Sequence, residues 1–202
     1  QERVAALLGK EAALFFPSGT MANQASLRVH TRPGDVVLAS RDCHILKYEG
    51  GAAAALSGLH IQTLGAEGRF DECELRAALP PNDPRFAPAT LVAIENTHNV
   101  AGGTIFPASD LARVAAAARD AKLALHLDGA RLWNAAVKQG VAPREIARGF
   151  DSVSVCLSKG LGAPAGSVLC GSGEFIGRAR RWRKMLGGGM RQVGILAAAG
   201  SY

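Results

Sequence analysis

Short apolar runs alternate with longer segments of helical periodicity along most of the chain. The apolar runs predict strands at residues 13–16, 36–39, 61–64, 90–94, 123–127, 152–156 and 167–170. The periodic segments predict helices over residues 1–9, 20–30, 45–55, 71–79 and 109–122, and another helix beginning near Glu174. Continuously apolar strands separated by helices are typical of a mainly parallel sheet covered on both faces. We therefore predict an α/β fold.

Local signals set several of these boundaries. Gly9 is expected to end the first helix, and Asp71 and Ser109 are expected to cap the helices that follow them. Residues 80–88 are rich in proline, asparagine and aspartate and predict an exposed loop. The chain shows no internal repeat and no second domain, so residues 1–202 are expected to form one domain.

Candidate chemistry gathers where the predicted strands end, which is where ligands bind in sheets of this kind. Lys159 follows a strand and lies in a loop of very small residues, so its amine has little bulk around it. Desolvation there would favour the neutral, nucleophilic amine. The alternative is an ordinary solvated lysine. The order of glycine and lysine does not match the phosphate loop of NTPases.

Asp128 ends another strand and precedes a glycine. A nucleophilic lysine and an acid at two strand ends are the minimum that pyridoxal phosphate (PLP) chemistry needs, with the acid facing the pyridine nitrogen. As a structural residue, Asp128 would instead cap the next helix. Arg131 suits bidentate binding of a carboxylate, or it pairs with a nearby acid.

A further candidate is the turn Ser18-Gly19-Thr20, between a strand and a helix. The free amides and dipole of a helix start suit a phosphate, but on this evidence alone Ser18 or Thr20 as an ordinary N-cap is the favoured interpretation.

Two histidines, His44 and His98, also follow strands directly. They are candidates for ring stacking and proton transfer, or else structural histidines. His126 and His30 are expected to be structural, and His60 shows no pattern.

Composition narrows the class of protein. An apolar content of 48% and a charged content of 20% fit a soluble globular protein, and no run is long enough to span a membrane. No signal peptide is recognisable at the start. The four cysteines show no Cys-x-x-Cys spacing, which indicates neither zinc nor a disulfide framework and favours a reducing compartment.

The formal net charge is +6, and the densest basic cluster covers residues 178–184. A solvated helix face or a subunit contact explains such a cluster, and anion binding is the other interpretation.

Taken together, these segments strongly resemble the L-threonine aldolases, within the aspartate-aminotransferase-like group of PLP enzymes. The resemblance rests on the residue types, order and spacing of residues 17–23, 44–45, 95–99, 125–131, 152–164 and 184–192. It therefore covers essentially the whole chain.

The resemblance implies a role for each candidate. Lys159 would bind PLP covalently, Asp128 would pair with the pyridine nitrogen, and Ser18, Gly19 and Thr20 would hold the phosphate. His44 would stack on the ring, and His98 would lie near the substrate hydroxyl. Arg131 would fix a cofactor oxygen and the substrate carboxylate. Lys184 and Arg191 match basic residues that complete the phosphate site of a neighbouring subunit.

The implied reaction is cleavage of threonine or allo-threonine to glycine and acetaldehyde. A cytoplasmic homo-oligomer, dimer or tetramer, is implied, with a small β-hydroxy amino acid as substrate and no nucleic acid or membrane partner. The family's N-terminal segment and C-terminal small domain would lie outside this chain, so residues 1–202 are expected to be the PLP-binding large domain. A related β-eliminating lyase, or a PLP-binding fragment without activity, are the alternatives.

Overall fold

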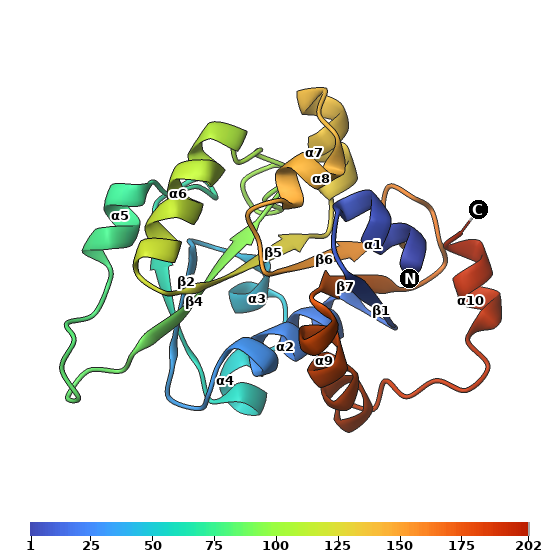
Figure 1. The fold of residues 1–202 in the computed structure, drawn as a ribbon, viewed down its shortest axis with the longest axis horizontal. Helices are drawn as coiled ribbons and strands as arrows, with labels where there is room; N and C mark the ends of the chain where they lie inside the picture. Colours follow the sequence, from blue (N-terminus) through green and yellow to red (C-terminus); the bar gives the residue numbers. More distant parts are fainter. Residues whose placement is uncertain (202) are drawn as a thin grey trace.

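The computed structural model describes residues 1–201 and contains a seven-stranded mixed sheet (Figure 1). Its strands are β1 (Ala12–Phe16), β2 (Val36–Ser40), β3 (His60–Leu64), β4 (Ala89–Glu95), β5 (Ala124–Gly129), β6 (Ser152–Cys156) and β7 (Ser167–Gly171). They lie in the order β1-β7-β6-β5-β4-β2-β3. The five neighbouring strands β3, β2, β4, β5 and β6 run parallel, whereas β7 is antiparallel to both β6 and β1. The predicted α/β class with a mainly parallel sheet is confirmed.

Helices cover both faces of this sheet. They are α1 (Glu2–Leu8), α2 (Gly19–His30), α3 (His44–Lys47), α4 (Ala52–Ser57), α5 (Glu72–Ala77), α6 (Ala108–Asp120), α7 (Leu132–Gln139), α8 (Pro143–Ala147), α9 (Gly173–Met185) and α10 (Gly194–Ala199). Figure 1 shows α1, α5, α6, α7 and α8 on one face and α2, α4 and α9 on the other, with α10 at one end of the molecule. In residues 1–201, every helix is too short or too polar to cross a membrane.

Two of the predicted helix boundaries are wrong. The single helix expected over residues 45–55 is divided into α3 and α4, because Gly50 and Gly51 take positive φ angles of 62° and 74°, which no α-helix contains. Ser109 does not cap α6. It lies inside the first turn, where its hydroxyl donates to Asp110, and Pro107 is the N-cap residue.

Other local predictions are confirmed. Gly9 ends α1 in the left-handed conformation with φ 64°, which glycine adopts without strain. Asp71 begins α5 with a reciprocal capping box, since its carboxylate accepts from the Glu74 amide and Glu74 accepts from the Asp71 amide. Residues 80–88 form neither helix nor strand.

The central strands present different chemistry on their two faces. Leu125, Leu127, Val153 and Val155 point into the apolar core beneath the α6–α7 layer. Because side chains alternate along a strand, the intervening residues of β5 and β6 face α2 instead. This second face carries polar groups and leads to the carboxyl ends of the parallel strands.

Candidate active site

The carboxyl ends of β4 and β5 bring two acids side by side. Glu95 is the register partner of Asp128, and Asp128 is in turn the partner of Ser154 on β6. Both carboxylates are buried. Burial raises the pKa of Glu95, and repulsion by Asp128 raises it further. The charged form of Glu95 is therefore disfavoured at this buried edge of the sheet.

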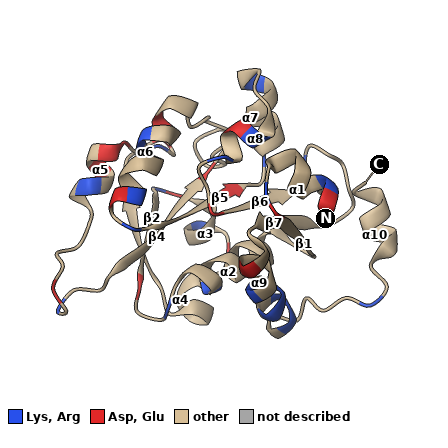
Figure 2. Ribbon diagram, viewed as in Figure 1, with Lys and Arg blue, Asp and Glu red and all other residues tan. Residues whose placement is uncertain are grey.

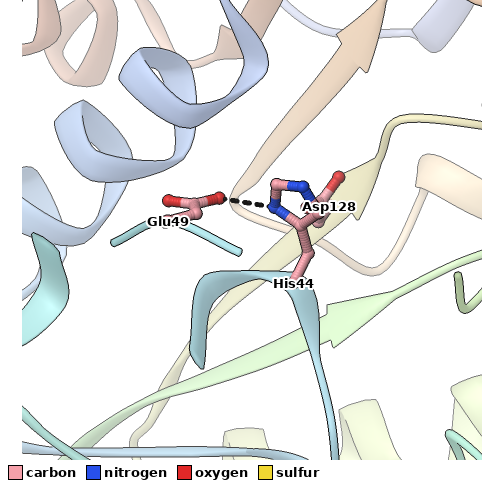
Figure 3. Close-up of side chains that lie close together, drawn as sticks. All are labelled: His44, Glu49 and Asp128. Atoms are coloured by element: carbon pink, nitrogen blue, oxygen red, sulfur yellow. Dashed lines mark hydrogen bonds and ion pairs between the residues drawn. The ribbon is translucent and has the colours of Figure 1, made fainter. Parts of the chain in front are cut away.

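His44, the first residue of α3, lies against this acidic edge together with Glu49 (Figure 3). The His44 Nδ1 atom is 2.9 Å from Glu49 Oε1, and one polar atom from each of His44, Glu49 and Asp128 lies within 4.8 Å of the others. Glu49 also accepts from Asn23 at 2.8 Å and from Gln24 at 2.6 Å. Asn23 links the pair to the sheet, because its amide nitrogen donates to Asp128 at 2.8 Å.

The hydrogen bond to Glu49 defines how the His44 ring can act. It raises the pKa of His44, and partial burial opposes that effect. An ionised carboxylate only accepts, so Nδ1 carries the proton and Nε2 is left as the accepting nitrogen of the neutral ring. Figure 3 shows the ring between Glu49 and Asp128. His44 is therefore a half-buried histidine with an oriented and basic Nε2.

Glu95 joins the two loops that carry the candidate histidines. One of its oxygens accepts from the backbone amide of His44 at 2.8 Å, and the other accepts from that of Asn99 at 2.9 Å. His98 is 1% exposed; its Nδ1 accepts from the Ala101 amide at 3.2 Å, and its Nε2 lies 3.8 Å from Glu95. Its Nε2 has no hydrogen-bond partner among residues 1–201. Of the two histidines, His44 is the one that is open to a ligand.

The turn at residues 18–20 lies against the strand that leads to Lys159. Ser18 is the N-cap of α2, and its hydroxyl accepts from the Met21 amide at 3.2 Å, so the capping interpretation holds for this residue. The amides of Gly19 and Thr20 occupy the first helical positions, where no intrahelical partner exists. A Cβ atom on Gly19 would lie 3.1 Å from the Sγ of Cys156 at the end of β6. The turn therefore places free donors and a positive helix end beside β6.

Lys159 lies in an exposed loop between β6 and β7. Its carbonyl accepts from the Gly162 amide at 3.0 Å, which closes a tight turn. Because the side chain is exposed, the expected desolvation of its amine is not found within the described chain. Burial is the largest influence on the Cys156 thiol and raises its pKa; of the three charged groups nearby, Lys159 and Arg131 lower that pKa, whereas Asp128 raises it. All three groups therefore lie around the end of β6.

Asp128 and Arg131 lie on either side of the turn between β5 and α7. Asp128 Oδ1 accepts from the Ala130 amide at 3.0 Å, so this carboxylate stabilises the turn but does not cap α7. Arg131 is itself the N-cap residue of α7 and is half-buried. In the described part of the chain it forms no salt bridge, so the alternative of pairing with a nearby acid is not observed.

The basic cluster is concentrated on α9 (Figure 2). Two of its arginines have structural roles, since Arg178 donates to the Val29 carbonyl and Arg183 to the Phe15 carbonyl, both at 2.7 Å. Lys184 and Arg191 are exposed, and within residues 1–201 no hydrogen bond joins them to the turn at residues 18–20. This chain therefore does not itself bring these two residues to that turn.

Sequence reasoning assigned no role to Asn23, Gln24 or Glu49, although all three are buried and hydrogen-bonded in the site. The periodicity of α2 could have indicated that Asn23 belongs to a polar face of this helix. Asn23, Ser26 and His30 are spaced to lie on one face of α2, among apolar neighbours. Glu49 has no comparable signal, because it follows an exposed tyrosine and precedes two glycines.

Comparison with known proteins agrees with this fold. The profile of the beta-eliminating lyase family matches residues 1–202, and the chain belongs to this family. The resemblance inferred from the motifs is confirmed: the chain is 44% identical to the low specificity L-threonine aldolase of Escherichia coli (strain K12) over 204 residues, covering 100% of this chain and 60% of that protein. It is 45% identical to low-specificity L-threonine aldolase 1 of Arabidopsis thaliana, covering 98% of this chain and 57% of the relative.

Solved structures show the same fold. One is described as a putative aromatic amino acid beta-eliminating lyase/threonine aldolase from an Exiguobacterium species; it superposes with a TM-score of 0.86 at 31% identity, over 98% of this chain and 55% of that one. Another is a putative L-allo-threonine aldolase from Listeria monocytogenes, with a TM-score of 0.84 at 28% identity, over 98% and 54% of the two chains. The chain thus spans a little over half the length of the relatives that it matches.

Proposed function

We propose that the chain is the PLP-binding large domain of a lyase that cleaves threonine or allo-threonine to glycine and acetaldehyde. The observation that carries the proposal is the gathering of Lys159, Asp128 and the turn at residues 18–20 around the ends of β5 and β6. The names of the relatives support this choice of reaction.

The residues present fit PLP in three respects. Phosphate suits the unpaired amides of Gly19 and Thr20 at the positive end of α2. A protonated pyridine nitrogen suits the buried carboxylate of Asp128. An aldehyde suits the exposed and sterically free amine of Lys159. When bound, PLP supplies an electron-accepting ring that stabilises the negative charge left on the α-carbon by carbon–carbon cleavage.

His44 and His98 are proposed for the ring contact and the proton transfer. The accepting Nε2 of His44, oriented and made more basic by Glu49, is suited to hold the proton of the substrate hydroxyl. His98 acts with Glu95, whose carboxylate fixes both histidine loops. Arg131 has no acidic partner within residues 1–201, so its guanidinium is available for the carboxylate of an amino acid.

The protein is further proposed to act as a cytoplasmic homo-oligomer, dimer or tetramer. In this arrangement Lys184 and Arg191 of one copy complete the phosphate site of another. Their exposure, and the absence of contacts to the turn at residues 18–20 within the described chain, support a role between copies. The basic surface of α9 then faces protein and phosphate, with no nucleic acid or membrane involved.

Lys159→Ala tests the proposal, with Lys138→Ala as a matched change at an exposed lysine of α7. The protein mixed with PLP is expected to show a visible absorbance band and to form glycine and acetaldehyde from threonine. Lys159→Ala should lose both, and Lys138→Ala should keep both. Retention of the band and the activity in Lys159→Ala would exclude the assignment.

The same assay separates the alternatives by their products. Ammonia and a keto acid in place of glycine and acetaldehyde would identify a β-eliminating lyase. A PLP band without cleavage of threonine would identify a chain that binds the cofactor but does not complete the reaction.

A further inference from the structure

A strip of polar side chains is buried between α2 and the two central strands. On β5 and β6 these side chains alternate with leucines and valines that face the opposite core. The strip, here called the polar seam, consists of Asn23, Ser26 and His30 of α2, His126 and Asp128 of β5, and Ser152 and Ser154 of β6. It extends from the amino end of β6, at Ser152, to the carboxyl end of β5, at Asp128.

Apolar packing lies on both sides of the polar seam. On one side α2 packs with α9, β1 and β7 through residues that include Phe16, Ala25 and Ile176. On the other side it packs with β2, β4 and α4 through Leu27, Val37 and others. A sheet covered by helices is usually apolar throughout, and a buried polar group must be hydrogen-bonded to avoid a desolvation cost. Hydrophobic packing alone therefore does not account for the seam.

The orientation of Asn23 gives the polar seam a direction. Its Nδ2 lies 2.8 Å from a carboxylate oxygen of Glu49 and 2.8 Å from one of Asp128, and ionised carboxylates only accept. The amide oxygen must therefore face the other way, where it accepts from the Ser154 hydroxyl at 2.7 Å. Both N–H groups of Nδ2 therefore donate, one to each of the two acids.

The same constraint assigns the proton on His126. Its Nε2 lies 3.2 Å from the Asn23 amide oxygen, which only accepts, so Nε2 carries the proton. The opposite nitrogen, Nδ1, then accepts from the hydroxyl of Ser152 at 2.8 Å or of Ser26 at 2.9 Å. His30 Nε2 lies 2.8 Å from the Ser152 oxygen, and the tautomer of His30 decides which of these two atoms donates. The hydrogen bonds from His126 through Asn23 thus donate toward Asp128 and Glu49.

Burial keeps both rings neutral, as such a chain requires. It lowers the pKa of His126 to about 3 and that of His30 to about 4. The charged form of His30 on α2 further lowers the pKa of His126, and the titratable residues Cys43, His44, Glu95 and Asp128 line the same small cavity as His126. A neutral histidine has one donor and one acceptor nitrogen, which matches its two neighbours in the seam.

We propose that Asn23 and His126 are positioning residues, and that the polar seam is a one-way hydrogen-bond chain that keeps Asp128 ionised and aligned. Aligned donors polarise one another in a low-dielectric interior, so the amide that reaches Asp128 is a stronger donor than an isolated one. The benefit to the pyridine nitrogen rests on the proposed function, whereas the direction of the chain does not.

The direction is tested by ¹⁵N NMR of protein labelled at histidine, with His126 assigned through His126→Gln. We expect the His126 proton on Nε2 and no titration of this ring between pH 5 and 9. A proton on Nδ1, or a titration within that range, would overturn the proposal. This measurement needs no cofactor, so it stands if the protein does not bind PLP, an outcome that would refute only the proposed function.

The effect on Asp128 is tested with His126→Leu and His126→Gln, with His60→Leu as a change at an exposed histidine outside the polar seam. Glutamine retains a donor toward Asn23 and an acceptor toward Ser152, whereas leucine removes both. His126→Leu should weaken PLP binding about 10-fold, near the upper limit expected for loss of one neutral hydrogen bond, here the bond to the Asn23 amide oxygen. It should also move the pH dependence of the cofactor absorbance. His126→Gln should stay within about threefold of the parent protein by the same reasoning, and His60→Leu should be unchanged.

A role in packing alone predicts a different result. Both His126 variants would then lose thermal stability while the pH dependence of the absorbance stayed the same, and this outcome would overturn the proposal. If His126→Leu does not fold, the affinity and pH profile of His126→Gln, together with the position of the His126 proton, decide the question.

Discussion

Glu49→Gln is the substitution that tests how His44 is controlled. The Glu49 side chain is fully buried and accepts hydrogen bonds from Asn23, Gln24 and His44. Glutamine offers one accepting oxygen and one donating nitrogen in the same space. At least one of the three donors would therefore face another donor, and the charge that holds the His44 proton would be gone.

The size of the effect follows from the hydrogen bonds that are lost. A hydrogen bond to a charged group contributes about 1.5–3 kcal/mol, and removal of a buried charge returns part of its desolvation cost. The free energy of unfolding at neutral pH is therefore expected to fall by about 1–3 kcal/mol. The pKa of His44 should fall as well, because the bond to Glu49 is the largest cause that raises it and burial acts in the opposite direction.

The raised pKa of His44 also determines how the stability difference between the parent protein and Glu49→Gln changes with pH. The pKa of His44 in the folded protein lies above its ordinary value of 6.5, so this histidine adds stability that is complete below pH 6.5. The contribution disappears as the pH rises through the folded pKa. The stability gap between the parent protein and Glu49→Gln should therefore be larger at pH 5.5 than at pH 8.5.

Urea unfolding at the two pH values, and an NMR titration of the His44 ring, measure these quantities. Glu174→Gln, at an exposed acid in the first turn of α9, serves as the control and should change stability by less than about 0.5 kcal/mol. An unchanged pKa of His44 in Glu49→Gln, or a stability gap that widens with pH, would refute the reasoning.

Three further substitutions have defined outcomes. Asp128→Asn should retain some cofactor but lose most threonine cleavage, because an amide cannot hold the ring nitrogen protonated; near-normal turnover would contradict the role of this acid. Gly68→Ala should lower the free energy of unfolding by about 2 kcal/mol or more in urea titrations, because φ is +78° and the added carbon would lie 2.4 Å from the His98 ring. Asp71→Ala should cost about 1 kcal/mol through loss of the capping box on α5 and leave the PLP absorbance unchanged; a changed spectrum would show that α5 influences the site.

Much of the fold could be predicted from local pattern. Continuously apolar runs such as those of β4, β5 and β6 are typical of strands buried in a sheet that helices cover on both faces. Gly9 and Asp71 mark helix boundaries, and their effect depends only on residues a few positions away. The errors arose where two local signals competed. Apolar residues favoured one helix over residues 45–55, but Gly50 and Gly51 take positive φ angles there and the helix is divided.

The candidate site, like the fold, could be predicted from the sequence only in part. Lys159, Asp128, His44 and the turn at residues 18–20 could be found because each lies at or just after the end of a strand, and strand ends of a parallel sheet meet at one edge. The pattern could not give their environments: Lys159 is exposed and His98 is buried, the reverse of what their proposed roles suggest in isolation.

The sequence by itself determined the sheet, its covering helices and the set of reactive residue types, because periodicity and strand ends are local properties of the chain. Only the tertiary structure decided which polar groups are paired. Asn23 contacts Asp128 across 105 positions, and Ser26 contacts His126 across 100. Donor and acceptor direction in the polar seam follows from those distant contacts, since carboxylates that can only accept fix the orientation of Asn23 and, through it, of His126.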